Sequence, residues 1–376
     1  MQLLGGLTPK QFLSRHWQKR PLLVRGAIPG FRAPLSPPEI RKMAGSAEVE
    51  SRLVSRSGRH WQLEHGPFSA RQFARMPQKN WTVLVQGINL HSDPADALLR
   101  RFAFLPSARL DDLMVSLAAP GGGVGPHLDS YDVFLLQGEG RRRWRISAQA
   151  DHRLVSGAPL AILAHFRPEE EWVLNPGDML YLPPHIAHDG VALDTCTTFS
   201  IGFRAPAARE LAAGLLDRLD QELEGEALPP RYADAGLAPQ RSPGRIPDGM
   251  LRYAKRVASL LRLTDQRIED ALGQYLSDPK PQVAFERPAP ALENRAFGRT
   301  LQTAGLRLDR RTQLLYRSGN LYINGETLQA EGEDRILLHR LSDRRCLQPG
   351  TRLSKPAHLI LYRWYVYGWA HPGLGC

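Results

Sequence analysis

The pattern of apolar and polar positions changes its period once along the chain, near residue 205. Before that point, short stretches alternate apolar and polar residues with a period of two, which is typical of half-buried strands. Trp61–Leu63 and Trp81–Gln86 are such stretches, and we expect both to lie in the outer sheet of a β-barrel. After that point the period is that of a helix. The apolar stripe of Ala207–Glu224 consists of Leu211, Leu215, Leu216, Leu219 and Leu223.

Short helices are predicted on both sides of this change. In the first part the predicted helices are Pro9–Gln18, Pro37–Ala44 and Asp93–Phe104, and each has a proline in or near its first turn. A strand is predicted at Leu22–Arg25. Those of the second part follow the Pro/Gly-rich linker Leu228–Gly249 and are Met250–Leu263 and Asp265–Leu276. Apolar stripes on such helices usually form core, but a helical segment between two compact domains is also a suitable dimer surface.

The last part of the chain predicts a small unit of helices around a hairpin. Leu314–Tyr316 and Leu321–Ile323 flank the turn Arg317–Asn320, which is typical of a β-hairpin. A helix is expected at Glu331–Leu341, and the aromatic tail Leu359–Ala370 is expected to pack as core or as an interface. Helices and a hairpin in this order are the outline of a winged-helix domain.

A second hairpin is predicted where Tyr131–Gln137 and Arg141–Ile146 flank a short glycine-containing turn. On the return strand, Arg142 shares one face with Trp144 and Ile146, because side chains alternate between the faces of a strand. The two apolar residues mark this face as the buried one, so Arg142 is predicted to point inward. The other arginines of the strand, Arg141, Arg143 and Arg145, are predicted to form a solvated face.

An inward arginine needs an anionic partner, since an unpaired buried charge is very costly. A dicarboxylate ligand would supply the anion, held bidentately by the guanidinium. The alternative is an ion pair with a carboxylate of the protein itself, such as Asp132 or Glu139.

Candidate metal ligands lie on either side of this arginine. His127 and Asp129 follow the glycine-rich run Gly121–Pro126, and on an extended chain their side chains point to the same side. His188 comes later, after a Gly-Asp turn and a Pro-Pro turn. Two imidazoles and one carboxylate can occupy one face of an iron(II) octahedron and leave three positions for a co-substrate and dioxygen.

His185 competes with His188 for the third ligand position. Pro183 and Pro184 end the predicted strand Met179–Leu182 and turn the chain away from its ladder. Because His185 follows the prolines directly, we expect it to be a turn residue. His188 is therefore the predicted ligand.

Two stretches, Met114–Trp144 and Asn175–Phe203, resemble the JmjC-type cupin oxygenases. They are most similar to the bacterial ribosomal oxygenases, arginine hydroxylases that act on the sixteenth ribosomal protein of the large subunit. The opening Phe12–Leu23 also resembles that group. The likeness is dense over residues 1–205 and thinner beyond, and its most specific element is the run Pro120–Asp129 together with the arginine triplet. One departure is His185, where such proteins commonly have glycine.

The resemblance implies roles for individual residues. It makes His127, Asp129 and His188 the iron(II) ligands, and it gives Arg142 the distal carboxylate of 2-oxoglutarate. Further candidates for a hydroxyl near that carboxylate are Ser116, Thr198 and Ser200.

It also implies an α+β, mainly β architecture. A double-stranded β-helix (cupin/JmjC) barrel is expected over residues 1–205, a helical dimerisation segment over 206–280, and a winged-helix-like domain over 281–376. The implied activity is hydroxylation of an arginine side chain, at C3, of the ribosomal protein, with consumption of O2 and 2-oxoglutarate. The alternatives are a related protein hydroxylase or demethylase with another substrate, or a catalytically silent cupin that binds RNA or ribosomal protein.

The composition indicates where the protein is located, but it does not indicate its activity. The 376 residues carry a net charge of +11, which favours acidic or nucleic-acid-rich surroundings, although the basic clusters are short and match no established nucleic-acid-binding motif. No stretch of about 18 apolar residues exists, so no membrane span is expected. The first residues do not resemble a signal peptide. A cytoplasmic location is therefore predicted, since the reducing cytoplasm also suits iron(II). A homodimer through the helical segment is what the resemblance implies.

Overall fold

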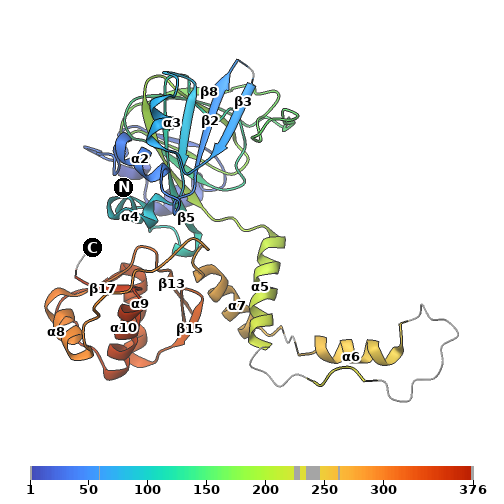
Figure 1. The fold of residues 1–376 in the computed structure, drawn as a ribbon, viewed down its shortest axis with the longest axis vertical. Coiled ribbons are helices and arrows are strands. Elements are labelled where there is room, and N and C mark those ends of the chain that lie inside the picture. Colours follow the sequence, from blue (N-terminus) through green and yellow to red (C-terminus); the bar gives the residue numbers. More distant parts are fainter. Residues whose placement is uncertain (1, 59, 224–228, 234–245, 261–262, 374–376) are drawn as a thin grey trace. The chain divides into compact units, whose positions relative to one another are not determined.

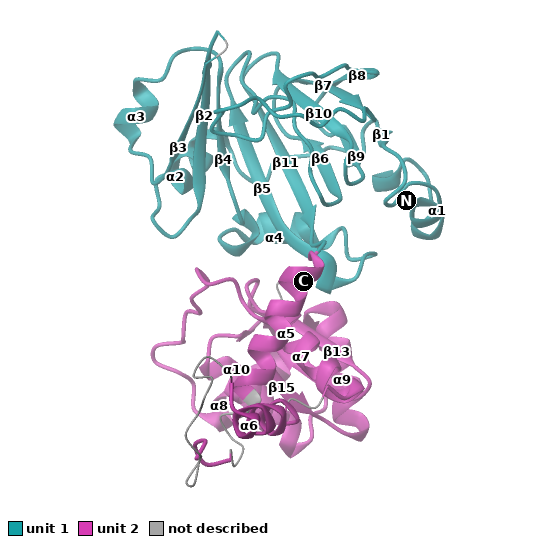
Figure 2. Ribbon diagram, turned by 90° about the vertical axis from the view of Figure 1, so that its right-hand side faces the viewer, with its two compact units in different colours: residues 1–205 teal, residues 206–376 magenta. Residues whose placement is uncertain are grey.

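The computed structural model describes residues 2–58, 60–223, 229–233, 246–260 and 263–373 (Figure 1). The chain divides into two compact units, residues 1–205 and 206–376 (Figure 2). The second unit holds both the segment 206–280 and the residues beyond it, so the boundary at 280 stays a prediction. Most of the predicted linker Leu228–Gly249 lies outside the described residues.

Two antiparallel sheets form the barrel of unit 1. The large sheet has the order β1-β9-β6-β11-β5-β4-β2-β3. Its strands are β1 (Leu22–Val24), β2 (Ser51–Ser57), β3 (His60–His65), β4 (Trp81–Val85), β5 (Leu110–Ala118), β6 (Val133–Gln137), β9 (Met179–Leu182) and β11 (Cys196–Phe203). The small sheet has the order β10-β7-β8, and its strands are β7 (Arg142–Ser147), β8 (Glu170–Leu174) and β10 (Ala187–Ala192).

The side chains between the sheets form the barrel interior. One buried cluster joins Val133, Leu135, Leu180 and Leu182 of the large sheet to Trp144, Ile146 and Leu174 of the small one. The alternate residues of the large sheet, such as Phe134 and Phe199, pack on the other side in the main core. The expected double-stranded β-helix is therefore present.

The predicted hairpin between Tyr131–Gln137 and Arg141–Ile146 is wrong. β6 pairs with β9 and β11, whereas β7 pairs with β8 and β10, so the chain crosses from one sheet to the other after β6. The crossover is tied to the start of β11: Gly138 N–H donates to the Thr197 carbonyl at 2.8 Å. A Cβ on Gly140 would lie 2.2 Å from the Thr195 carbonyl oxygen, which leaves room only for glycine. A short glycine turn fits a hairpin and a crossover equally well.

Helices cover the outer side of the large sheet. They are α1 (Pro9–Arg15), α2 (Pro37–Ala44), α3 (Ala70–Ala74) and α4 (Asp93–Arg100), with 3-10 turns at Gln2–Leu4, Ile88–Leu90 and Ser107–Arg109. α2 has the predicted bounds, whereas α1 and α4 end earlier than predicted. α1 ends at Arg15, and three residues later Gln18 adopts a left-handed conformation (φ 56°), in which its N–H donates to the Tyr181 hydroxyl at 2.8 Å.

Unit 2 contains the helices and hairpin that the sequence predicted. Its helices are α5 (Ala208–Leu223), α6 (Asp248–Ala258), α7 (Asp265–Ser277), α8 (Asn294–Ala304), α9 (Gly332–Arg344) and α10 (Lys355–Val366). Its sheets are β16-β12-β17 and β13-β14-β15, with strands β12 (Leu306–Leu308), β13 (Leu314–Arg317), β14 (Asn320–Ile323), β15 (Glu326–Gln329), β16 (Cys346–Leu347) and β17 (Ala370–Pro372). The β13–β14 hairpin is confirmed, and the aromatic tail is core, with Leu361, Trp364 and Tyr365 buried.

Candidate metal centre

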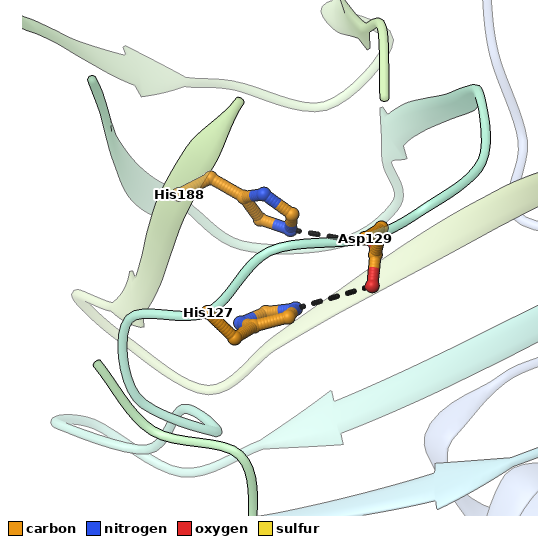
Figure 3. A group of neighbouring side chains, drawn as sticks. All are labelled: His127, Asp129 and His188. Carbon is orange, nitrogen blue, oxygen red and sulfur yellow. Dashed lines mark ion pairs between the residues drawn. The ribbon is translucent and has the colours of Figure 1, made fainter. Parts of the chain in front are cut away.

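His127 and His188 lie side by side at one end of the barrel. Their backbones form an isolated antiparallel bridge, with N···O distances of 3.0 and 2.9 Å, and their ring centroids are 4.2 Å apart. The Asp129 carboxylate faces both rings, 3.9 Å from Nε2 of His127 and 3.6 Å from Nε2 of His188 (Figure 3). One ligand atom from each residue lies within 4.8 Å of the others, so three donors converge on one point.

The protonation state of the two imidazoles suits metal binding. Nδ1 of His127 donates to the Gly125 carbonyl and Nδ1 of His188 to the Ile186 carbonyl, each at 2.9 Å. A carbonyl only accepts, so the proton sits on Nδ1 and the Nε2 lone pair is directed at the converging point. Burial, with the neighbouring His127, lowers the pKa of His188 to about 4, which keeps this ring neutral at neutral pH.

The glycine run before His127 is required by close backbone packing. A Cβ on Gly123 would lie 2.5 Å from the carbonyl oxygen of Gly190 on β10. Gly125 has φ 81°, a conformation that residues with side chains rarely adopt. The run therefore places His127 directly beside the strand that carries His188.

His185 lies in the turn after the two prolines, as the sequence predicted. It is exposed and has φ 65°. Its backbone N–H donates to the Asp129 carbonyl at 2.8 Å. The turn therefore positions the carboxylate ligand by its main chain, and the imidazole of His185 is outside the convergent group.

Arg142 points into the barrel, in agreement with the alternation argument. It is 5% exposed and shares its face of β7 with Trp144 and Ile146, and its guanidinium lies 5.8 Å from the Trp144 ring. Within the described part of the chain, its Nε and Nη2 atoms have no hydrogen-bond partner. Asp132 instead accepts from Tyr181 and Arg109. A buried guanidinium without a protein anion fits a bound carboxylate.

Ser116 lies on β5 at the same end of the barrel as Arg142. It is buried, and its hydroxyl donates weakly to the Thr198 carbonyl at 3.5 Å. Ala118, two residues further along β5, belongs to a buried cluster with Ala192, the register partner of Arg142. Small buried side chains thus lie on β5 and β10 at the end of the barrel where Arg142 begins β7.

The other two hydroxyl candidates lie on β11. Thr198 and Ser200 are both buried, and both pair with residues of β6. The Thr198 hydroxyl donates to the Gln137 side chain at 3.1 Å. Thr198 therefore has a partner within the protein, whereas Nε and Nη2 of Arg142 have none among the described residues.

The sequence reasoning missed one ion pair next to the metal centre. Arg145, predicted to be solvated, donates to Asp189 at 2.5 Å, and the Asp189 side chain is only 5% exposed. Arg145 also lies 5.8 Å from the Phe166 ring. Asp189 follows His188 directly, but its partner becomes visible only when the register of β10 against β7 is known.

Tyr131 marks an electronegative region near the same site. Burial raises the pKa of its hydroxyl, and the charges of Asp129, Asp112 and Asp111 raise it further. The phenol therefore stays neutral, and three carboxylates lie close enough to act on it. Their combined potential favours a positively charged neighbour.

Comparisons with known proteins agree with this geometry. Residues 97–211 match the JmjC domain family and residues 259–369 the ROXA-like winged helix. The chain is 39% identical over 284 residues to ribosomal protein uL16 3-hydroxylase of Escherichia coli, which covers 74% of each chain. It is 38% identical over 223 residues to a probable ribosomal oxygenase of Haemophilus influenzae, covering 56% of this chain and 52% of the relative.

Solved structures give the same result over nearly the whole chain. The crystal structure of E. coli YcfD superposes with a TM-score of 0.83 and 32% identity, covering 97% of this chain and 98% of that one. YcfD in complex with cobalt and 2-oxoglutarate superposes with a TM-score of 0.79 and 33% identity.

The barrel with its two-histidine, one-carboxylate centre defines a JmjC-type oxygenase. More narrowly, the chain belongs to the ribosomal oxygenase family that includes the E. coli uL16 3-hydroxylase.

Proposed function

We propose that this chain is an iron(II)- and 2-oxoglutarate-dependent oxygenase that hydroxylates an arginine side chain, at C3, of the ribosomal protein uL16. The observation that carries the proposal is the buried guanidinium of Arg142, whose Nε and Nη2 have no hydrogen-bond partner among the described residues, in the barrel that holds the metal-binding triad. A catalytically silent binding module would need neither feature. The family relationship to uL16 3-hydroxylase supports the substrate.

His127, Asp129 and His188 would hold the metal, because their donor atoms fit a facial site. Bound iron(II), 2-oxoglutarate and dioxygen supply the oxidising chemistry, in which 2-oxoglutarate becomes succinate and carbon dioxide. The chain's own part is to orient and to exclude water. The Nδ1 hydrogen bonds fix the ring planes, and Arg142 would hold the distal carboxylate as an ion pair.

The wall between these two sites is apolar. A Cβ on Gly190 would lie 2.6 Å from the Trp144 ring, so the indole covers this glycine on the inner face of β10. Ile146 and Leu174 belong to the same buried cluster. An apolar wall strengthens the ion pair of Arg142 with its ligand, since the local dielectric is low.

The charge near the metal centre suits an arginine substrate. Asp111 and Asp112 begin β5, and both act electrostatically on Tyr131 beside the ligand Asp129. Asp112 also accepts a hydrogen bond from Gly87 N–H, which holds its carboxylate in place. Negative charge near the ligand Asp129, partly offset at Asp111 by its ion pair with Arg204, favours a guanidinium over a neutral side chain.

We also propose a cytoplasmic homodimer that pairs through α5, α6 and α7. Their exposed apolar side chains include Leu216 (57%), Leu251 (51%), Met250 (44%) and Ile268 (38%). Leu219 of the predicted stripe is only 3% exposed and belongs to the fold of its own unit, so Leu216 is the better position for a test. In the described residues, no helix is long and apolar enough to cross a membrane.

The activity is tested with purified protein, unmodified uL16, iron(II), 2-oxoglutarate and ascorbate. Mass spectrometry should show one added oxygen atom on uL16, dependent on 2-oxoglutarate and accompanied by succinate. Fragmentation should place the oxygen on an arginine. Succinate release with a different ribosomal protein and none with uL16 would reject the substrate. Loss of a methyl group from a methylated peptide, without an added oxygen, would favour the demethylase alternative.

A further inference from the structure

Asp189 is a buried carboxylate that lies outside the metal-binding triad. Its side chain is only 5% exposed, and it follows the ligand His188 directly on β10. Successive side chains of a strand point to opposite faces, so Asp189 points away from the metal centre, toward the outer face of the small sheet. Burial of an ionised carboxylate is costly unless a partner compensates its charge. A carboxylate in this position therefore needs a cation on the outer face.

That cation is Arg145 of β7. The two residues are register partners on adjacent strands, and Nη2 of Arg145 lies 2.5 Å from Oδ2 of Asp189. The guanidinium also lies over the Phe166 ring, 5.8 Å from its centroid. The pair is thus a short cross-strand contact that connects β10 to β7 one residue after the metal ligand.

The other side chains of β10 give this strand little to pack with. Besides the ligand histidine and Asp189, the strand Ala187–Ala192 consists of two alanines, a glycine and a valine. On the inner face, Gly190 lies beneath the Trp144 ring, where a Cβ would be 2.6 Å from the indole. On the outer face, Asp189 is the one residue of the strand that can form an ion pair. Because small side chains specify the register of a strand weakly, this ion pair is its anchor on the outer face.

The register of β10 decides where the imidazole of His188 points. A shift by one residue would turn every side chain of the strand to the opposite face, and the imidazole would leave the barrel interior. In the observed register, His188 lies opposite Ile146, and its N–H donates to the His127 carbonyl at 2.9 Å. An anchor that fixes this register therefore also fixes how the two imidazoles face each other.

A second carboxylate beside Arg145 lacks this burial. Glu171 lies opposite Arg145 on β8, the other adjacent strand. Its side chain is 51% exposed, and its ion pair with Arg143 spans 3.9 Å. Exposed ion pairs of this kind contribute little, whereas removal of one partner of a buried pair leaves an uncompensated charge. Two carboxylates thus flank one guanidinium on the same sheet, and Asp189 is the buried one.

We infer that Asp189, held by Arg145, is a positioning residue of the metal centre, which anchors β10 on β7 and thereby places Nε2 of His188 for the metal. The inference rests on the proposed function and adds to its metal site two residues that do not contact the metal. Removal of residues that hold metal ligands in place typically lowers metal affinity by about 10- to 100-fold.

The test uses the full-length protein with cobalt(II) as the probe metal. Asp189→Asn keeps the size of the side chain and removes its charge, and Glu171→Gln is the matched control on the other side of Arg145. Arg145→Gln removes the partner cation, whereas Arg145→Lys keeps a cation and should preserve the site. The Arg145 side chain is 31% exposed, so its two variants decide the question even if Asp189→Asn does not fold.

The readouts are the dissociation constant for cobalt(II) from calorimetry, the visible absorption of the bound ion, and the unfolding midpoint without metal. Asp189→Asn and Arg145→Gln should raise the dissociation constant by about tenfold or more. They should also shift the absorption, because the geometry of the ligands around the ion changes. Glu171→Gln and Arg145→Lys should bind cobalt(II) with nearly the wild-type affinity and absorption.

A contribution to stability alone would lower the unfolding midpoint of Asp189→Asn but leave the affinity and the absorption of the folded protein unchanged, and this result would overturn the inference. Equal weakening of cobalt(II) binding by Asp189→Asn and Glu171→Gln would also overturn it. Either outcome, with a wild type that binds cobalt(II) and hydroxylates uL16, leaves the proposed function intact. A wild type that binds no divalent metal would reject both the positioning role and the metal site.

Discussion

Replacing Arg142 by methionine should separate co-substrate binding from folding. The change keeps an unbranched side chain in the barrel but removes the guanidinium, whose Nε and Nη2 have no hydrogen-bond partner in the part of the chain that the structure describes. The variant should therefore lose affinity for 2-oxoglutarate without losing its fold. In the absence of 2-oxoglutarate it should be at least as stable as the wild type, because the wild type then carries a buried charge without an anion.

The magnitude follows from the burial of the site. Removing one partner of a buried ion pair costs about 3–5 kcal/mol, and each 1.4 kcal/mol is a factor of about ten. Arg142 is 5% exposed, so solvent screens the pair little. We expect the KM for 2-oxoglutarate to rise by about a hundredfold or more.

The assay is succinate release as a function of 2-oxoglutarate concentration, together with thermal unfolding with and without 2-oxoglutarate and a divalent metal. The wild type should gain stability from the ligand, and Arg142→Met should gain little. Arg143→Met is the matched control, because Arg143 lies on the other face of β7 and its side chain is 36% exposed. Equal, mild effects of the two substitutions on KM would refute the inward-facing reasoning.

Three further predictions concern the metal, pH and assembly. Calorimetry with a divalent cation should show no binding to the variants His127→Ala, Asp129→Ala and His188→Ala, whereas His185→Ala should still bind the cation. Binding that survives in His188→Ala but is lost in His185→Ala would make His185 the third ligand in place of His188. Burial raises the pKa of Asp178, but hydrogen bonds from Asn175 N–H, Gly26 N–H and Arg25 outweigh burial and leave this pKa below its usual value of 3.8. The ionised carboxylate therefore stabilises the fold above about pH 4. This contribution is lost as the pH falls through the lower pKa of the folded state. Urea unfolding of Asp178→Asn should therefore differ most from the wild type near neutral pH, and a constant difference down to pH 2 would contradict this. Leu216→Asp with Leu251→Asp should give a 42.0 kDa monomer by light scattering, where the wild type gives twice that mass; a monomeric wild type would reject the dimer.

Features that depend on local sequence were predictable. The β13–β14 hairpin was found because its turn and both strands are adjacent in sequence. The inward direction of Arg142 was found because alternation on one strand does not depend on which strand pairs with it. The convergence of His127 with Asp129 required only their spacing.

Features that depend on strand pairing were not predictable in the same way. β6 and β7 are consecutive, with a glycine turn between them, yet they lie in different sheets. The Arg145–Asp189 ion pair joins residues far apart in the sequence, and only the register of β10 on β7 brings them together. The sequence contains both residues but does not show that they are partners.

The backbone bridge between His127 and His188 has a consequence for how the protein obtains its metal. Two of the three ligands are held in place by main-chain hydrogen bonds, so loading the site requires little ordering of the chain. Main-chain bonds of this kind do not distinguish one divalent ion from another, and ions later in the first transition series bind such donors more tightly than iron(II). We therefore expect cobalt, nickel and zinc to compete with iron(II) for this site, so that activity depends on the supply of iron(II) relative to these ions.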